Sequence, residues 1–431
     1  VSDGSVVVKV DNVVVAKASG DSLGTLTDGS HTLRVEATDS AGNVGSAEVS
    51  FTVDTTPPAV GINSVTTPIN VNNLAITGTR ESGATITISA NTAATVGSVT
   101  YPSPTTWSCA ISNLASGANN ITVTATDGVG NTATATASIT YDALAPTITI
   151  ASPATGTTSD NTPLLTYSAS DGSVVVKVDN VIVAKTSGDS LGTLTDGSHT
   201  LRVEATDSAG NVGSAEVTFT VDTTPPAVTI NTVTTPTNTS NQTITGTRET
   251  GATISVSVNT SATVGAVTYP SATTWSGAIS NFASGANNIT VTATDGVGNT
   301  ATATKNIVYD STPPALTIDT LTTPTKSIPQ TIGGTREDGA SIIVSVNTTA
   351  AVGTINYPTM TTWSCTISNL VAGTNNITVT ATDAANNSAT ATSSITVDNI
   401  APAVTINSVT TPTNSSNQTI TGTRESGATI T

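Results

Sequence analysis

The amino-acid sequence is internally repeated, and this repetition constrains its fold more than any other feature. Residues 1–60 and 169–228 differ at only four positions, at an offset of 168 residues. A second unit recurs at an offset of 88 residues, which carries Trp275 onto Trp363 and Asp310 onto Asp398. Such a chain places near-identical supersecondary units in a row. A motif that occurs once in every unit is therefore first explained as part of the repeated fold rather than as a functional site.

Proline-bearing linkers mark the boundaries between units. Val53-Asp54 is followed by Thr-Thr-Pro-Pro, and comparable linkers follow Asp142, Asp222, Asp310 and Asp398. Proline cannot donate to a strand ladder, so it ends a strand and stiffens the connection. The linkers predict two unit types in the order A-B-A-B-B-B, with the outer two units incomplete. Type A units are 1–54 (partial) and 143–222; type B units are 55–142, 223–310, 311–398 and 399–431 (partial). We therefore expect a segment of a longer protein, whose neighbouring domains are its partners.

Each unit has the pattern of β-strands. Residues 120–126 and 132–140 alternate apolar and polar side chains, which is typical of half-buried strands, and Asp11-Asn12 is a hairpin turn pair. No segment shows a helical stripe with caps. The sequence predicts an all-β fold, a tandem array of seven-stranded immunoglobulin-like β-sandwich domains that forms an elongated rod.

Recurring phrases give the chain a resemblance to a known family. They include Ile-Thr-Gly-Thr-Arg-Glu-Ser-Gly-Ala-Thr at 76–85, Thr-Thr-Trp-Ser at 105–108 and Ala-Thr-Asp-x-x-Gly-Asn at 125–131 and 205–211. The chain resembles tandem bacterial Ig-like domains of large repetitive extracellular or surface proteins, many of them adhesins. The resemblance implies an extracellular or cell-surface location in a bacterium. Residues 383–387 depart from the loop phrase, since they read Asp-Ala-Ala-Asn-Asn without the glycine.

Composition narrows the possible partners. The net charge of −17 argues against binding to nucleic acid and to anionic membrane surfaces. The apolar runs are only a few residues long, so no membrane span is expected in this segment. Cys109 and Cys365 occupy equivalent positions, where Gly277 stands in the third type B unit. Alternation places both cysteines on a core face as small hydrophobic residues; a covalent contact between chains would require an exposed strand.

Carboxylates are concentrated at the predicted ends of the units. Strand counting places Glu81, after the second strand of its unit, and Asp127, after the sixth, at the end where the linker brings in Asp54. Clustered carboxylates repel one another unless a cation neutralises them, and Ca²⁺ accepts six to eight oxygen ligands in flexible geometry. The hypothesis is a calcium ion at each domain junction. Its predicted ligands are Asp54, Glu81 and Asp127; Asp142, Asp171 and Asp207; Asp222, Glu249 and Asp295; Asp310, Glu337 and Asp383; and Asp398 with Glu425.

A structural explanation of these carboxylates stays open beside the calcium hypothesis. Aspartates before Gly or Thr-Thr-Pro are ordinary turn and cap residues. An arginine directly precedes each type B glutamate, as Arg80 precedes Glu81, and could neutralise it in an ion pair. Asp171 has Ser170 before it instead, which favours the junction of Asp142, Asp171 and Asp207 as the calcium site.

The sequence argues against an enzyme. Its two histidines, His31 and His199, are equivalent positions at the rim of a core face, with no repeated acid or thiol partner evident. Trp107, Trp275 and Trp363 are predicted as one core anchor per complete type B unit. The expected function is a structural spacer or stalk, rigidified at its junctions. The alternatives are a self-assembling filament, in which like chains are partners, and Ig-like modules that bind a ligand such as a glycan.

Overall fold

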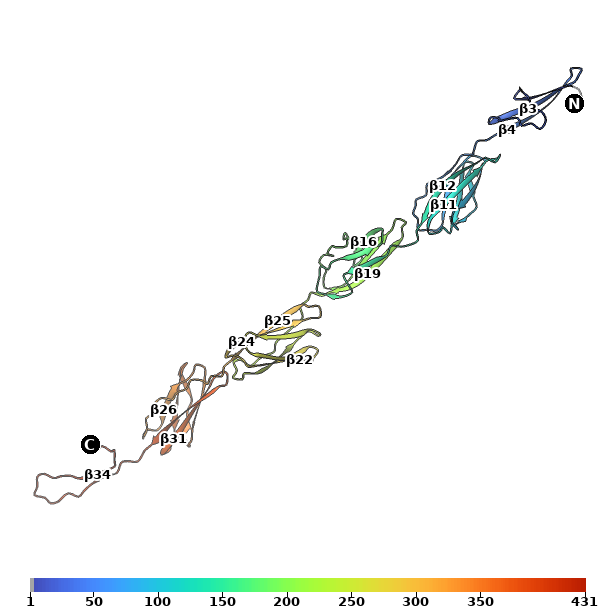
Figure 1. Cartoon of the computed structure of the whole chain (residues 1–431). Coiled ribbons are helices and arrows are strands. Elements are labelled where there is room, and N and C mark those ends of the chain that lie inside the picture. Colours follow the sequence, from blue (N-terminus) through green and yellow to red (C-terminus); the bar gives the residue numbers. More distant parts are fainter. Residues whose placement is uncertain (1–3) are drawn as a thin grey trace. The chain divides into compact units, whose positions relative to one another are not determined.

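The computed structural model describes residues 4–431, which form strands and loops without a helix (Figure 1). The chain divides into two compact units, Val1–Asp222 and Thr223–Thr431. Among the described residues, no helix is long and apolar enough to cross a membrane. Each sheet draws its strands from only one of the predicted segments, and the fold class is the predicted one.

Residues 55–142 form a sandwich of two antiparallel sheets. One sheet has the order β5-β6-β10-β8, with β9 also on β10, and the other has the order β12-β11-β7. The number of strands is eight rather than the predicted seven, because two separate short strands, β8 and β9, both pair with β10. The strands are β5 (Val60–Ile62), β6 (Leu74–Arg80), β7 (Thr85–Ala90), β8 (Thr95–Val96), β9 (Thr100–Ser103), β10 (Thr106–Ser112), β11 (Gly117–Thr126) and β12 (Thr132–Tyr141).

A tryptophan anchors the core of this sandwich, as predicted. Trp107 is 1% exposed, and its Nε1 donates hydrogen bonds to the carbonyl oxygens of Gly61 and Thr79, both at 3.1 Å. Gly78 lies flat against the indole, and a Cβ atom there would come within 2.5 Å of the ring. Cys109 is buried with a free thiol, so the prediction of a small core residue is confirmed. Burial raises the pKa of that thiol, which opposes its reactivity.

Residues 143–222 form the complete type A sandwich, with the predicted seven strands. Its sheets have the orders β13-β15 and β14-β19-β18-β16-β17. Asp179 and Asn180 turn the β16–β17 hairpin with φ angles of 51° and 66°, the left-handed conformation that a two-residue hairpin turn requires. The strands are β13 (Ile148–Ser152), β14 (Gly156–Thr158), β15 (Thr166–Ala169), β16 (Ser173–Val178), β17 (Val181–Val183), β18 (Gly197–Thr206) and β19 (Val212–Val221).

The described part of the first segment, residues 4–54, forms a single sheet; residues 1–3 of the predicted domain lie outside the described residues. Its order is β2-β1-β3-β4, which matches the strands β17, β16, β18 and β19 of the complete type A sandwich. The four strands are β1 (Ser5–Val10), β2 (Val13–Val15), β3 (Gly29–Thr38) and β4 (Val44–Val53).

The second compact unit contains the two further complete type B segments. Residues 223–310 form two sheets, with the orders β20-β23-β22 and β21-β24-β25. Residues 311–398 also form two sheets. One has the order β26-β30-β28, with β29 also paired to β30, and the other has the order β27-β31-β32. In 223–310 a single bridge, Val228 to Arg248, stands where β5 lies in the first type B sandwich, and the single strand β22 replaces β8 and β9, so the strand number falls from eight to six. The strands are β20 (Gln242–Thr247), β21 (Thr253–Val258), β22 (Thr263–Ser271), β23 (Thr274–Ser280), β24 (Gly285–Thr294), β25 (Thr300–Tyr309), β26 (Gln330–Thr335), β27 (Ser341–Val346), β28 (Ala351–Val352), β29 (Asn356–Thr359), β30 (Thr362–Ser368), β31 (Gly373–Thr382) and β32 (Ser388–Val397).

The segment 399–431 contributes a pair of short strands, β33 (Val404–Ile406) and β34 (Gly422–Arg424). Its apolar side chains have no core, and Ile406 and Ile420 are 75% and 70% exposed.

Candidate functional site: the domain junctions

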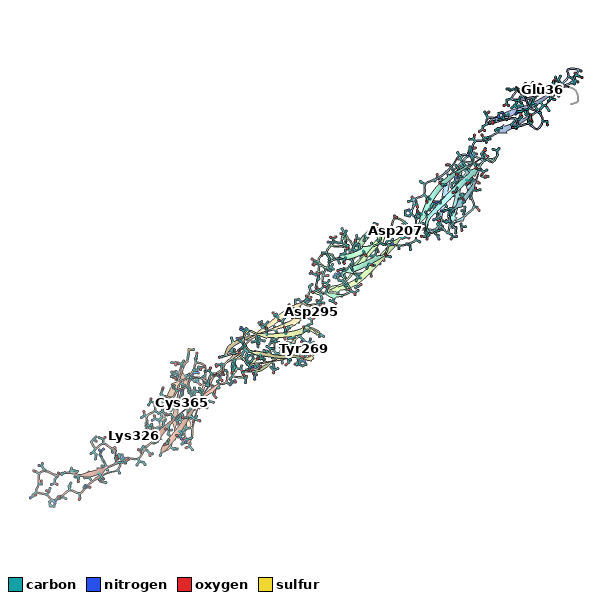
Figure 2. All side chains as sticks on the ribbon, in the orientation of Figure 1. Glu36, Asp207, Tyr269, Asp295, Lys326 and Cys365 are labelled. Atoms are coloured by element: carbon teal, nitrogen blue, oxygen red, sulfur yellow. The ribbon has the colours of Figure 1, made fainter. Side chains whose placement is uncertain are left out.

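Two loops that carry predicted site residues lie at the same end of the first type B sandwich. Glu81 follows β6, and Asp127 follows β11. The loop after β6 leads into β7, whose first residue Thr85 pairs with Thr126, the last residue of β11. Corresponding pairs bring the loops of Glu249 and Asp295 together, and those of Glu337 and Asp383. Figure 2 labels Asp295, which follows β24, and Asp207, which follows β18 of the type A sandwich.

The aspartate of this loop is held by N–H donors of its own loop. Asp127 Oδ1 accepts hydrogen bonds from the backbone N–H groups of Val129, Gly130 and Asn131 at 2.7–2.9 Å. Asp127 Oδ2 accepts a fourth from the Asn131 side-chain Nδ2 at 2.8 Å. Burial works to raise the pKa of Asp127, but the donors of Asn131, Val129 and Gly130 outweigh it and leave that pKa below its ordinary value. The carboxylate is therefore held ionised as the centre of the loop.

The same asparagine reaches back to the preceding segment. Asn131 Nδ2 also donates to the backbone carbonyl oxygen of Asp54 at 2.9 Å. One amide group thus joins the Asp127 carboxylate of a sandwich to the linker that enters it. We call this arrangement of loop aspartate, asparagine and linker carbonyl the Asp–Asn clamp.

The clamp recurs at two more junctions. Asn211 Nδ2 donates to Asp207 Oδ2 at 2.8 Å and to the Asp142 carbonyl oxygen at 2.9 Å. Asn387 Nδ2 donates to Asp383 Oδ2 at 2.9 Å and to the Asp310 carbonyl oxygen at 2.8 Å, although its loop has no glycine. The repeated element is therefore the aspartate with the asparagine four residues later.

The side chains of the linker aspartates Asp54, Asp142, Asp310 and Asp398 also fix their own linkers. Oδ1 of Asp54 accepts a hydrogen bond from the N–H two residues later, in Thr56, at 3.0 Å. Asp142, Asp310 and Asp398 make the same contact with Leu144, Thr312 and Ile400 at 2.9–3.0 Å. These are the side-chain turns that the structural explanation predicts for aspartate before a proline linker.

The glutamates contact the incoming strand rather than the loop aspartates. Glu81 N–H donates to the Ala59 carbonyl oxygen at 2.8 Å, and Glu81 Oε2 accepts from Ala59 N–H at 3.3 Å. Glu249 pairs in the same way with Ala227, and Glu425 with Ala403. Glu337 N–H donates to Ala315.

The arginines that precede the glutamates have another partner. The Arg80 guanidinium lies over the Tyr101 ring, with its Cζ 3.9 Å from the ring centroid, and donates to the Ala84 carbonyl oxygen. Arg248 and Arg336 stack on Tyr269 and Tyr357 in the same way, at 4.0 Å. Within the described residues no ion pair joins Arg80 to Glu81, so this sequence-based alternative is wrong: a cation–π contact holds the guanidinium.

The two remaining predicted calcium ligands are Asp171, in the complete type A sandwich, and Asp222, at the boundary between the two compact units. Asp171 is exposed next to Gly172, which packs against the backbone of Thr206 and Asp207. Asp222 ends the first compact unit, where its N–H donates to the Thr158 carbonyl oxygen at 2.9 Å.

Within residues 4–431, no group of three or more His, Cys, Asp or Glu residues is arranged to hold a metal ion. Two oxygens of a carboxylate offer about four acceptor sites, and Asp127 already accepts four hydrogen bonds. The described side chains therefore do not present a calcium cage, and calcium binding stays a prediction.

The histidines are structural, but they have an acid partner that the sequence reasoning missed. His199 is 8% exposed, with Nδ1 2.8 Å from Asp179 Oδ2 and Nε2 2.7 Å from the Thr195 carbonyl oxygen. His31 makes the same contacts with Asp11 and Thr27. The Thr195 carbonyl and the Asp179 carboxylate raise the pKa of His199. Acceptors at both ring nitrogens favour the doubly protonated imidazolium.

Family models match three parts of the chain. Residues 3–55 and 146–223 match a bacterial Ig-like domain, and residues 359–431 match the bacterial Ig-like domain of group 3. No curated protein sequence matches the chain.

Solved structures of tandem domains also match the chain. The protocadherin GammaB4 extracellular domain is 16% identical, covering 92% of this chain and 77% of that one, with a TM-score of 0.29. A tetra-tandem repeat in the extending region of a large adhesion protein is 20% identical, with coverages of 79% and 99% and a TM-score of 0.37. An I-band fragment of titin is 14% identical, with coverages of 59% and 99% and a TM-score of 0.39.

Proposed function

We propose that this chain is a structural spacer of a bacterial extracellular or cell-surface protein, because residues 3–55, 146–223 and 359–431 match models of bacterial Ig-like domains. In this role the chain is not an enzyme. Its domains set the distance between the parts of a longer protein, and its junctions limit bending. The observation that carries the proposal is the recurrence of the Asp–Asn clamp at Asn131, Asn211 and Asn387.

The clamp suits a spacer because it acts on the linker itself. A hinge bends by changing the φ and ψ angles of a few residues between two rigid bodies. The linker after Asp142 is fixed by proline, by the Asp142 side-chain turn to Leu144, and by the carbonyl bond from Asn211. Each contact removes backbone freedom where a hinge would otherwise form.

The test is to remove the clamp and measure bending. Spin labels on strands β12 and β19 would report the distribution of distances between two adjacent sandwiches by pulsed electron paramagnetic resonance. We expect Asn211→Ala to broaden that distribution, whereas Thr87→Ala, at an exposed position in the middle of β7, leaves it unchanged. Equal distributions in the two variants would remove the basis of the proposal.

Calcium at the junctions remains part of the proposal as a separate hypothesis, motivated by the concentration of carboxylates there. Its sharpest form concerns Asp142, Asp171 and Asp207. If calcium binds there, millimolar calcium raises the melting temperature of a tandem of residues 55–222, and a chelator lowers it. An unchanged melting temperature would exclude calcium while leaving the hydrogen-bonded clamp intact.

The filament and ligand-binding alternatives predict different measurements. A filament of like chains would appear as a regular multi-chain lattice in electron microscopy, and a lectin-like array would bind glycans. A spacer gives single chains and no glycan binding.

A further inference from the structure

One side-chain contact of the type B segments is replaced in residues 311–398. In the other three copies an asparagine Nδ2 donates a hydrogen bond to a threonine Oγ1 at 2.8–2.9 Å, and these pairs are Asn63–Thr77, Asn231–Thr245 and Asn407–Thr421. The equivalent positions in residues 311–398 are Asp319 and Gly333. Both members of a contacting pair have therefore changed in one copy of the repeat, and the neutral hydrogen bond between them is lost.

The change opens a hollow on the outer face of the sheet that contains β26 and β30. Gly333 pairs with Ser364 on one side, and its carbonyl oxygen accepts a hydrogen bond from the Asp319 N–H at 2.8 Å on the other. A Cβ atom at Gly333 would stand 3.6 Å from both Asp319 Oδ2 and Ser364 Cβ. Thr331 and Thr335, two residues away along β26, lie on the same face and close the ends. The resulting Asp319 hollow has a volume of about 400 Å³.

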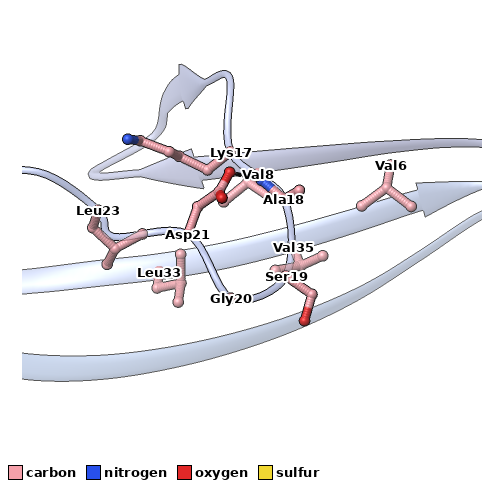
Figure 3. A pocket seen from close by; sticks show the side chains of 10 residues that line it. All are labelled: Val6, Val8, Lys17, Ala18, Ser19, Gly20, Asp21, Leu23, Leu33 and Val35. Carbon is pink, nitrogen blue, oxygen red and sulfur yellow. Dashed lines mark hydrogen bonds between the residues drawn. The ribbon is translucent and has the colours of Figure 1, made fainter.

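The carboxylate of Asp319 borders this hollow without a partner of its own. Within residues 4–431, its side-chain oxygens take part in no hydrogen bond or ion pair. The hollow in Figure 3, lined by Leu23 and Leu33 among others, also has an aspartate at its edge. There, however, Asp21 Oδ2 accepts a hydrogen bond from the Ala18 N–H at 2.7 Å. An ionised carboxylate only accepts hydrogen bonds, so a ligand of the Asp319 hollow has to supply donors.

We propose that the Asp319 hollow binds the guanidinium group of an arginine side chain on a partner protein. A guanidinium is flat and carries five N–H donors, two of which match the two oxygens of a carboxylate. The hydroxyl groups of Thr331 and Ser364 line the same hollow and can accept further N–H groups. A lysine ammonium is a compact, strongly hydrated charge and gains less from a slot that is one side chain wide.

The charge of the chain favours the same class of partner. A net charge of −17 attracts a basic protein and repels an acidic one. The site belongs to one sandwich only, because its two defining residues, Asp319 and Gly333, occur together in no other type B segment. This inference does not depend on the spacer function.

The test is a nuclear magnetic resonance titration of the isotope-labelled 431-residue chain with N-acetyl-arginine amide. We expect saturable shifts of the Gly333 and Gly334 amide signals, and none at Thr77 and Thr245, where the Asn–Thr pair closes the equivalent position. N-acetyl-citrulline amide has nearly the same shape without the charge. It should bind about tenfold more weakly, because hydrogen bonds between charged groups contribute more than those that involve a neutral group.

Variants of the chain locate the site. Asp319→Asn and Gly333→Thr should each abolish the response of the Gly334 amide. Both variants are expected to fold, because the other type B segments carry these side chains at the same positions. Asp338→Asn removes an exposed carboxylate elsewhere on the same sandwich and should leave the response unchanged.

The site can also be transferred to another sandwich. Asn231→Asp together with Thr245→Gly reproduces the pair in residues 223–310, and the Gly246 amide should then respond to N-acetyl-arginine amide. The inference is overturned if the Gly334 amide of the parent chain does not respond, or if the citrulline compound binds equally well. It is also overturned if Asp319→Asn or Gly333→Thr keeps the response, or if Gly246 of the double variant shows none.

Discussion

Removal of the Asn211 amide tests the clamp most directly, because that group holds two partners at once. Asp207 is 8% exposed, and its Oδ1 keeps the N–H donors of Ala209 and Asn211 at 2.8 Å when the side chain is lost. Asn211→Ala therefore removes only the bonds to Asp207 Oδ2 and to the Asp142 carbonyl oxygen.

The magnitude follows from the chemistry of these two bonds. A hydrogen bond to a charged group contributes about 1.5–3 kcal/mol, and one between neutral groups contributes about 0.5–1.5 kcal/mol. Water reaches part of the loop and can replace some of the lost hydrogen bonding. We therefore expect Asn211→Ala to lower the free energy of unfolding of the 143–222 sandwich by about 2 kcal/mol. For a domain of this size that corresponds to a fall in melting temperature on the order of 10 °C.

Hydrogen exchange by mass spectrometry on the full chain separates the weakening of the 207–211 loop from the release of the linker after Asp142. We expect faster exchange in the 207–211 loop and in the linker at Leu144, with strands β6 and β10 of the preceding sandwich unchanged. If Asn211→Ala exchanges at Leu144 as slowly as the Thr87→Ala control, the asparagine does not hold the linker and the reasoning fails.

Three further predictions follow from the cores and from the histidine. Gly78→Ala places a Cβ atom 2.0 Å from the Gly61 carbonyl oxygen and should destabilise its sandwich by about 3 kcal/mol, whereas Gly128→Ala, with no atom within 4 Å, should be nearly neutral in the same urea titration. Asn119 is 0% exposed and bridges Ala115, Gly117 and Ile139, so Asn119→Ala should cost about 3 kcal/mol by leaving buried groups unpaired; a midpoint within error of the parent would contradict this. His199 has a raised pKa, so its stabilising contribution is complete below about pH 6.5, the ordinary histidine pKa, and is lost as the pH rises through the higher folded-state value. His199→Gln should remove this fall in stability, and an unchanged pH profile would show that the ring is not charged.

Much of the fold could be read from the sequence because each unit has local signals that agree with one another. Alternation places Trp107 and Cys109 on one face of β10, and both are 1% exposed. Asp-Asn marks the hairpin turn that the φ angles of Asp179 and Asn180 confirm. Strand number was less predictable, because short edge strands depend on single bridges whose formation is decided by packing.

The position of the candidate site could be predicted from the sequence, but the hydrogen-bond partners of its residues could not. Strand counting puts Glu81 and Asp127 in loops at one end of a sandwich, and the Thr85–Thr126 pair shows this arrangement. The asparagine was missed, although it stands four residues after the aspartate in every copy, as Asn131 does after Asp127. That fixed spacing was the available signal, since a short amide side chain at this distance can reach back to the aspartate.

The sequence by itself determined the repeat, the strand alternation and the concentration of carboxylates near the linkers, since these are properties of spacing along the chain. Only the tertiary structure decided which groups the polar and charged side chains contact. It placed Arg80 on Tyr101 rather than on Glu81, His199 against Asp179, and the Asn131 amide on the Asp54 carbonyl. Each of these contacts joins residues about 20 or more positions apart, and a side chain selects among such partners only when folding has brought their backbones into register.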